Sequence, residues 1–246
     1  MEKQQYDILF RLEESHWWYL GMQRMVDALL TRYLDRNRTH RVLDAGCGTG
    51  GMSSHLQQLG AVVGLDLADE ALALCRRRDL PSLVRGSVEQ LPFASQSFDL
   101  VVSLDVIYHM AVGNDTLALE EFHRVLRPGG LLVIRVPAYN WLHGAHDVAV
   151  HTRHRYSRRE LASKLRAVGF RIRKLTHVNS FLFPVAALKR LLEGSSHSFC
   201  SDLEMPPPLL NRALLGVLSL EAALLPLLSL PWGLSVMAVA TKAECG

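Results

Sequence analysis

The chain has 246 residues, of which 49% are hydrophobic, so it is long and apolar enough for one elaborated domain or one domain with a small subdomain. Its net charge of +3, from 27 basic and 24 acidic residues, is too balanced to indicate a nucleic-acid partner. The four cysteines form no Cys-x-x-Cys pair, which predicts reduced thiols in a cytosolic protein.

The N-terminal segment predicts helical structure and no targeting signal. Residues 1–14 are polar and charged, so we expect no signal peptide. Apolar side chains recur at helical spacing within residues 5–35, and an aromatic group stands at residues 16–19. No run of about 20 residues lacks both charge and proline, which argues against a membrane span.

Short apolar runs rich in β-branched residues alternate with helical patterns through the middle of the chain. Strands are expected at residues 41–44, 62–66, 83–86, 98–104, 131–136 and 170–175. Helices are expected at residues 51–59, 69–78, 114–126 and 156–168, with a turn at 127–130. This alternation predicts a parallel sheet with helices on both faces, in which ligands bind at the carboxyl ends of the strands.

A turn with glycine at every second position follows the first expected strand. Gly46, Gly48 and Gly50 let the backbone approach a ligand that a Cβ would exclude, which suits a nucleotide-like cofactor. No Gly-Lys-Ser/Thr follows this turn, so the sequence lacks the lysine that a triphosphate site requires.

The residue pattern changes in the C-terminal quarter of the chain, where alternating short strands and helices are no longer expected. A helix is expected at residues 181–192, a polar and loose stretch at 194–204, and a strongly apolar helix at 209–225 after three prolines. A helix that is apolar on most sides is buried, paired with another chain or embedded in an interface. Residues 234–241 close the chain as an expected strand.

The segment 42–50, Val-Leu-Asp-Ala-Gly-Cys-Gly-Thr-Gly, resembles the first motif of class I S-adenosylmethionine-dependent methyltransferases. Further motifs of that family match in order and spacing across residues 40–176: Val-Gly-Leu-Asp at 63–66, Gly-Ser-Val-Glu-Gln-Leu-Pro-Phe at 86–93, Phe-Asp-Leu-Val-Val-Ser at 98–103 and Val-Leu-Arg-Pro-Gly-Gly at 125–130. The resemblance implies an α/β fold, a Rossmann-like seven-stranded, mostly parallel sheet with helices on both faces.

The resemblance also implies a division of the chain. Residues 1–39 would form an N-terminal lid, whose aromatic residues exclude water from the cofactor or serve only as core packing. Residues 40–180 would form the cofactor-binding core, 181–232 an apolar helical insertion and 233–246 the final strand. The insertion either is simply buried, caps the acceptor pocket, or makes a homodimer or peripheral membrane contact through 209–230.

The expected cofactor is S-adenosyl-L-methionine. Asp66 stands where the second strand should end beside the first, and a carboxylate there accepts both ribose hydroxyls in the family; the alternative is a helix-capping aspartate. Asp44 would hold the charged end of methionine through water or backbone contacts. The expected cofactor contacts are Asp44, Gly46, Gly48, Gly50, Asp66, Leu67, Ser87, Val88, Leu104 and Trp18.

One expected cofactor contact departs from the family pattern. The third-strand loop usually reads Gly-Asp-Ala-Glu, and its aspartate accepts from the adenine amino group, whereas Ser87 stands at that place here. A neutral hydroxyl can accept the same hydrogen bond, but a charge-assisted bond is stronger. The backbone at Val88 is expected to share the recognition.

The segment after the fifth expected strand supplies the candidates for catalysis. His146 or His151 is a candidate base, with Asp147 as its orienting partner, and His109 after the fourth strand is a further candidate. The expected substrate contacts are Tyr139, Asn140, Arg155 and Tyr156. In the alternative interpretation, Arg155 and Tyr156 pin a loop to the core. The histidines at 143, 146, 151 and 154 lack a nearby cysteine, so we expect no metal.

The expected function is in-line methyl transfer to a small, apolar or lipid-linked acceptor. The enzyme is expected to be biosynthetic, and either cytoplasmic or peripherally bound to a membrane. The acceptor atom, O, N or C, stays open. One alternative is another use of the same cofactor, an intramolecular displacement or a decarboxylation. A second is a non-catalytic scaffold with the same fold, and a third is a macromolecular methyltransferase, which the lack of a broad basic surface disfavours for RNA.

Overall fold

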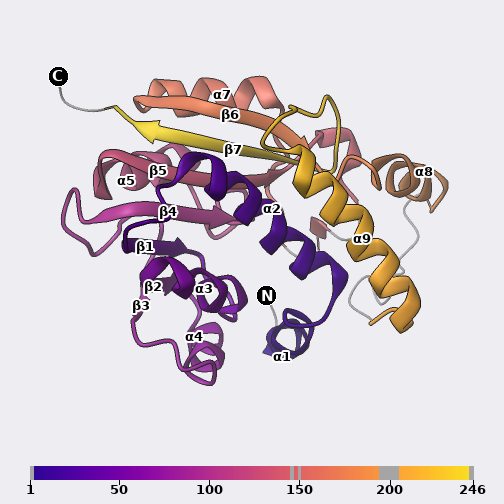
Figure 1. Cartoon of the computed structure of the whole chain (residues 1–246), viewed down its shortest axis with the longest axis horizontal. Coiled ribbons are helices and arrows are strands. Elements are labelled where there is room, and N and C mark those ends of the chain that lie inside the picture. The colour runs from indigo at the N-terminus through magenta and orange to yellow at the C-terminus, as the bar shows by residue number, and fades with distance from the viewer. Residues whose placement is uncertain (1–2, 145–146, 149–150, 194–204, 244–246) are drawn as a thin grey trace.

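The computed structural model describes residues 3–144, 147–148, 151–193 and 205–243, which form one seven-stranded sheet in the order β3-β2-β1-β4-β5-β7-β6 (Figure 1). The strands are His40–Ala45 (β1), Gly60–Asp66 (β2), Leu83–Arg85 (β3), Phe98–Leu104 (β4), Leu126–Pro137 (β5), Phe170–Val178 (β6) and Ser235–Lys242 (β7). Strands β1 to β5 pair in parallel, and β7 runs antiparallel to both β5 and β6. The expected mostly parallel sheet is therefore confirmed.

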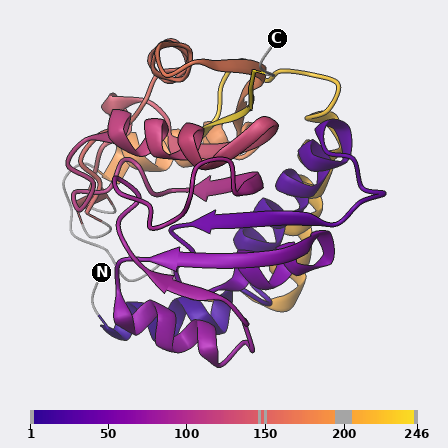
Figure 2. The same cartoon turned by 90° about the vertical axis from the view of Figure 1, so that its left-hand side faces the viewer.

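Helices cover both faces of this sheet (Figure 2). They are Lys3–Leu12 (α1), Trp17–Tyr33 (α2), Gly51–Leu56 (α3), Asp69–Arg76 (α4), Asp115–Val125 (α5), Arg158–Ala167 (α7), Phe183–Glu193 (α8) and Pro208–Leu224 (α9), with short 3-10 turns at Gln57–Leu59 (η1) and Asn140–Leu142 (η2). Helices α5 and α7 pack on one face, and α2, α3 and α9 contribute to the core on the other.

The periodic segment expected over residues 5–35 is two helices and not one. Helix α1 ends at Leu12, and α2 begins at Trp17 after His16, whose Nδ1 accepts from the Trp18 N–H at 3.3 Å. The break turns the chain so that α2 buries Met22, Met25 and the following apolar residues against the sheet. Helical periodicity does not reveal such a break, because both helices carry the same repeat.

The turn expected at 127–130 lies inside β5. Phe98 of β4 pairs with Leu126 of β5, and Leu100 pairs with Leu131. The residues of β5 between these two pairs therefore outnumber those of β4, and they form an irregularity in the strand. Gly129 adopts φ 76°, a backbone conformation that favours glycine. Other boundaries shift where a local contact decides: α7 begins at Arg158 because the Ser157 hydroxyl accepts from the Glu160 N–H at 3.1 Å.

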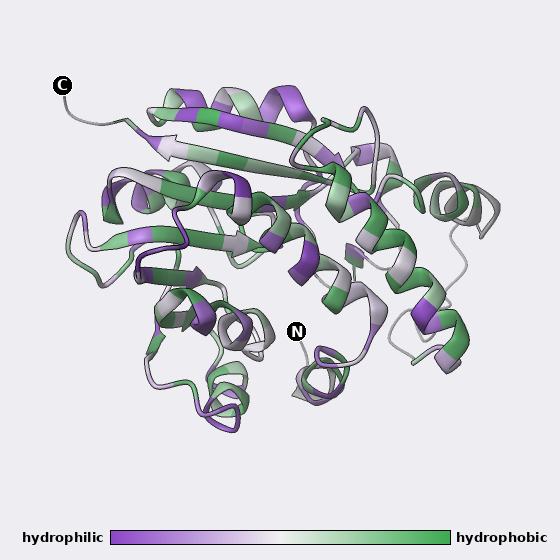
Figure 3. Ribbon diagram, in the orientation of Figure 1, coloured by the Kyte–Doolittle hydropathy of each residue, from purple (hydrophilic) through white to green (hydrophobic). Residues whose placement is uncertain are grey.

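Helix α9 lies beside α2 along one face of the sheet, and the two helices pack closely (Figures 1 and 3). A Cβ at Gly21 would stand 2.3 Å from Leu218 Cδ1, so glycine permits the approach. The opposite side of α9 is solvent-facing, with Leu209 82% exposed. Burial therefore accounts for one side of this apolar helix only. Within the described ranges, no helix combines the length and apolar character that crossing a bilayer requires.

Candidate functional site

The glycine turn follows β1 and is held against the end of β2. The N–H groups of Gly46 and Cys47 donate to the Leu65 carbonyl at 2.7 and 2.9 Å. Gly46, Gly48 and Gly50 have φ values of 87°, 53° and 85°, so all three use left-handed backbone. A Cβ at Gly46 would clash with Val106, whereas one at Gly48 would meet nothing within 4 Å. The surface beside Gly48 is therefore open to a ligand.

The Asp66 carboxylate lies directly at this turn. Its Oδ2 accepts from the Gly48 N–H and its Oδ1 from the Ala68 N–H, each at 2.9 Å. Burial raises the pKa of Asp66, and these two hydrogen bonds oppose the rise. Each carboxylate oxygen retains capacity for a further donor. The neighbouring Leu67, also an expected contact, is exposed.

Asp44 occupies a different position from the one expected. Its side chain is 2% exposed, and its Oδ2 accepts from the Ser53 hydroxyl at 2.5 Å. Burial raises the pKa of Asp44 to about 7, with a smaller effect from the carboxylates of Glu13 and Asp66. The residue thus joins β1 to α3, and its expected contact with the cofactor through water or backbone stays a prediction.

The expected adenine loop is a tight turn after β3. The Ser87 hydroxyl accepts from the Glu89 N–H at 3.2 Å, and the Gln90 N–H donates to the Ser87 carbonyl at 3.2 Å. The Ser87 hydroxyl oxygen has a second lone pair, so it can also accept a hydrogen bond from a ligand. The Val88 side chain is buried in the core, so only its backbone is placed to take part in recognition.

The turn between α1 and α2 is fastened to the glycine turn by Glu13, a residue that the sequence did not single out. Its Oε2 accepts from the Thr49 hydroxyl at 2.6 Å and from the Gly51 N–H at 3.0 Å, and Arg78 Nη2 donates to it at 3.1 Å. Arg78 also donates to the carbonyls of Thr49 and Phe10. No sequence signal distinguishes Glu13 from its charged neighbours, because the contacts arise only in the fold.

The carboxyl ends of β4 and β5 carry a second unexpected group, the arginine at position 135. Arg135 pairs with Leu104 across the strands, and its Nη2 donates to Asp105, which follows β4 with φ 60°. The Arg135 guanidinium lies 5.8 Å from the centre of the Trp18 ring. In the sequence, Arg135 is a lone charge within the apolar run Leu131–Val136, and this pattern could have indicated a special role for it.

The candidate histidines lie partly at this edge. The rings of His109 and His151 meet edge to face at 5.7 Å, and His109 Nδ1 accepts from the Ala111 N–H at 3.1 Å. Burial lowers the pKa of His109, and His151 adds to the effect, which favours the neutral ring. With Nδ1 accepting from Ala111, a neutral ring has Nε2 as its donor, and the catalytic role of His109 stays a prediction. His146 lies outside the described residues.

Asp147, Arg155 and Tyr156 form buried contacts that hold the loop after β5. Arg155 donates from Nε and Nη2 to the two oxygens of Asp147, at 2.8 and 3.1 Å, and from Nη1 to the Ala138 carbonyl. The Tyr156 hydroxyl donates to Asp115 at 2.5 Å. Arg155 and Tyr156 are both buried, and these contacts fit the alternative in which they pin the loop, so their substrate contact stays a prediction.

The remaining expected substrate contacts split into two kinds. The Asn140 side chain accepts from the Arg155 N–H at 3.0 Å and so belongs to the pinned loop. Tyr139 stacks on His177 at 5.3 Å and lies 5.7 Å from the Phe183 ring and 5.8 Å from the exposed Trp141 ring. This aromatic group joins η2, β6 and α8 at one end of the sheet.

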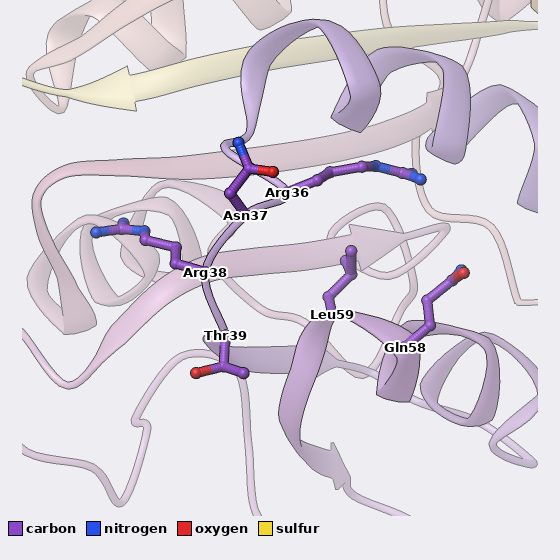
Figure 4. A pocket seen from close by; sticks show the side chains of 6 residues that line it. All are labelled: Arg36, Asn37, Arg38, Thr39, Gln58 and Leu59. Atoms are coloured by element: carbon purple, nitrogen blue, oxygen red, sulfur yellow. The ribbon is translucent and has the colours of Figure 1, made fainter.

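No three metal-ligating side chains gather anywhere in the described part of the chain. His154 Nε2 lies 2.8 Å from a Glu160 carboxylate oxygen, and His143 lies 3.5 Å from the Thr152 carbonyl. A separate polar hollow of about 360 Å³ is lined by Arg36, Asn37, Arg38, Thr39, Gln58 and Leu59 (Figure 4). The hollow lies at the amino ends of β1 and β2, whereas the glycine turn lies at their carboxyl ends. It therefore takes no part in this site.

Comparison with known proteins gives matches within the central part of the chain. Residues 43–134 match the family described as a methyltransferase domain. A malonyl-(acyl-carrier protein) O-methyltransferase of Enterobacter lignolyticus is 42% identical over 112 residues, 45% of this chain and 43% of that relative. Phthiotriol/phenolphthiotriol dimycocerosates methyltransferase 1 of Mycobacterium ulcerans is 41% identical over 99 residues, 38% of this chain and 36% of that relative. The chain thus spans less than half the length of these two relatives.

The fold likeness extends further than the sequence match. The structure of an S-adenosylmethionine-dependent methyltransferase from Mesorhizobium loti aligns with a TM-score of 0.58 at 18% identity. The alignment covers 87% of this chain and 96% of that chain. At this identity, the likeness shows a shared fold and no more.

Proposed function

We propose that this chain, whose core is a class I S-adenosylmethionine-dependent methyltransferase domain, transfers a methyl group to a small acceptor held at the carboxyl edge of the sheet. The open side of Gly48, next to the Asp66 carboxylate, is the observation that carries the proposal. S-adenosylmethionine supplies the reactive sulfonium methyl group when bound. The residues present fit it, since a glycine surface suits its amino-acid part and a carboxylate suits ribose hydroxyls.

The protein's contribution is alignment and the exclusion of water. The leaving group of a sulfonium is neutral, so holding the two reactants in line supplies most of the acceleration. In this proposal Asp66 holds the ribose, Trp18 shields the reacting atoms, and the backbone around Gly48 supports the amino-acid part. A base is needed only if the acceptor must lose a proton; His146 and His151 stay the candidates, with His109 as a donor.

The acceptor is proposed to be apolar or lipid-linked. Apolar side chains near the carboxyl edge are exposed on η2 and α8, and they are Trp141, Val185 and Leu188. The printed names of the two relatives fit this class, since one acts on a carrier-linked malonyl group and the other on a dimycocerosate lipid. Both cover only part of this chain, so the acceptor itself is part of the proposal.

We also propose that residues 209–230 make a homodimer or peripheral membrane contact. Leu209, Leu220 and Leu227 are exposed on this segment, although the side of α9 toward α2 is buried. Sedimentation at rising protein concentration detects self-association, and flotation with vesicles detects a membrane contact. Leu220→Gln should reduce whichever of the two is observed; a chain that stays monomeric and unbound to vesicles would contradict this part of the proposal.

Calorimetric titration with S-adenosylhomocysteine tests the cofactor site. Asp66→Ala should weaken binding by about a hundredfold or more, because each hydrogen bond to a charged group contributes about 1.5–3 kcal/mol and two ribose hydroxyls are involved. Asp69→Ala is the matched control, since that aspartate is exposed on α4 and pairs with an exposed Arg85. Equal affinity in the Asp66 variant would contradict the proposed ribose contact.

The reaction type is tested by the product. Methyl transfer leaves S-adenosylhomocysteine, whereas an intramolecular displacement leaves methylthioadenosine and a decarboxylation leaves neither. Incubating the full chain with S-adenosylmethionine and a panel of fatty acids, acyl thioesters and phenolic lipids should yield S-adenosylhomocysteine with at least one class. Methylthioadenosine as the product would support the alternative use of the cofactor.

A further inference from the structure

Arg135 is a buried cation near the end of β5. It is not one of the proposed cofactor contacts. The residue is 5% exposed, and its Nη2 donates to Asp105. Its Nε and Nη1 atoms have no hydrogen-bond partner among the described residues. Buried polar side-chain atoms are nearly always paired in folded proteins, so two unpaired donors on one guanidinium need an explanation.

Burying the Arg135 charge with two unpaired donors costs free energy of folding. Burial lowers the pKa of Arg135 to about 10, although Asp105 pairs with one of its nitrogens. An apolar residue of similar volume would avoid the cost of burying both the charge and the unpaired donors. A group that brings acceptor atoms and a negative charge would satisfy the same site.

Arg135 lies beside partly exposed groups at the carboxyl edge. Asp105 is one-third exposed, and the half-buried Trp18 ring lies over the guanidinium at 5.8 Å. Trp18 is in the first turn of α2, so a side chain and not a strand lies over the guanidinium on this side. Tyr19 lies near the same charge, and burial raises the pKa of its hydroxyl to about 12, so it stays a neutral donor.

The charges around this edge separate two regions. The Asp66 carboxylate lies at the glycine turn, which suits the ammonium and sulfonium charges of the cofactor. Arg135 stands on β5, beyond β4 from that turn. An anion bound to Arg135 would therefore lie on the acceptor's side of the site.

We propose that Arg135 binds a carboxylate of the acceptor, so that the substrate is an acid as well as apolar. A guanidinium recognises carboxylates through charge-assisted hydrogen bonds, and one cation already shared with Asp105 suits a monoanion better than a phosphate dianion. This inference rests on the proposed function, because it assigns a substrate group to the same site. It predicts a long-chain or aromatic acid, free or at the end of a carrier.

The test uses the full chain saturated with S-adenosylhomocysteine. Sodium decanoate, sodium benzoate and sodium malonate are titrated by thermal shift and calorimetry, each beside its primary amide, which keeps the shape and removes the charge. At least one acid should bind, and its amide should bind at least about tenfold more weakly, because a hydrogen bond to a charged group is lost.

Variants of Arg135 separate binding from structure. Arg135→Met should abolish acid binding and leave the melting temperature of the ligand-free chain unchanged or higher, because it removes a buried charge of similar volume. Arg135→Lys should retain weaker binding, since it keeps the charge and loses the planar donors. Arg171→Met, an exposed arginine on β6, is the control and should bind acids as the unaltered chain does.

Three results would overturn the inference. One is a panel in which no acid binds better than its amide. A second is an Arg135→Met chain that still binds acids but melts at a lower temperature, which marks a structural arginine. The third is an Arg135→Met chain with weaker affinity for S-adenosylhomocysteine and unchanged affinity for methylthioadenosine, which assigns the arginine to the cofactor's own carboxylate. Failure of the unaltered chain to bind S-adenosylhomocysteine is a separate result and speaks against the proposed function.

Discussion

Asp44 is a carboxylate whose ionisation opposes folding, although it sits in the most recognisable motif of the chain. Burial raises its pKa to about 7, whereas an aspartate in an unfolded chain titrates near about 3.9. A carboxyl group with a raised folded pKa stabilises the fold fully below the unfolded pKa, and this stabilisation is lost as pH rises through the folded value. Its effect is therefore confined to a window from about pH 4 to about pH 7.

Asp44→Asn should make stability less dependent on pH across that window. The amide stays neutral and its oxygen still accepts from the Ser53 hydroxyl, so the variant should gain up to about 4 kcal/mol relative to the unaltered chain between about pH 4 and about pH 8. Urea unfolding at several pH values measures the difference, with the exposed Asp69→Asn as control. A difference that does not change with pH would show that Asp44 titrates normally.

At the scale of elements, the contact between α2 and α9 requires the glycine at position 21 of α2, whereas the glycine at position 216 of α9 is not required for it. A Cβ at Gly21 would stand 2.3 Å from Leu218 Cδ1 and 2.9 Å from its Cβ, whereas a Cβ at Gly216 in α9 would meet nothing within 4 Å. The two positions therefore separate helix propensity from packing.

Alanine at the two glycines should have opposite effects. Gly216→Ala should raise stability by about 0.5–1 kcal/mol, because glycine is the poorer helix former. Gly21→Ala carries the same gain but forces Leu218 to shift, and overpacking costs about 1–3 kcal/mol, so the net result should be a loss. Chemical unfolding of both variants provides the comparison. Equal stabilisation in both would mean that the helices are not packed as described.

The loop between β5 and α7 is held by a buried ion pair between Arg155, an expected substrate contact or loop anchor, and Asp147, the expected partner of a catalytic histidine. Arg155 and Asp147 bond through two parallel hydrogen bonds, and both side chains are almost fully buried. Removing one partner of such a pair leaves the other charge without compensation.

Arg155→Gln should therefore lower the free energy of unfolding by about 3–5 kcal/mol. The exposed Arg159→Gln, four residues along the chain, should change it by less than about 0.5 kcal/mol. Thermal unfolding of both variants separates the structural role from the substrate contact. If Arg155→Gln unfolds as the unaltered chain does and loses only acceptor binding, the loop-pinning interpretation is wrong.

At the scale of the whole molecule, the sheet was predictable because its strands are short, apolar and separated by strong turn signals. The strand at 98–104 was predicted at its observed bounds, and the family motifs implied a seven-stranded, mostly parallel sheet. Local patterns of this kind carry information about the residues that form them. The division into lid, core and insertion is still a prediction.

The side-chain partners in the site were less predictable, because they join residues far apart in the chain. The contacts of Glu13 with Thr49 and Gly51 and the pairing of Arg135 with Asp105 depend on the folded arrangement of several elements. The break between α1 and α2 was missed for a different reason, since the helical repeat continues on both sides of it. The apolar pattern of α9 predicted burial, but it did not predict that only the side toward α2 would be covered.

The central claim is that the turn after β1 and the carboxylate at the end of β2 together hold an S-adenosyl nucleoside. A crystal structure of the full chain with S-adenosylhomocysteine tests it most directly. We expect the ribose hydroxyls within hydrogen-bond distance of Asp66 and the amino-acid part against the open side of Gly48. A nucleoside bound elsewhere, or none at saturating concentration, would contradict the account.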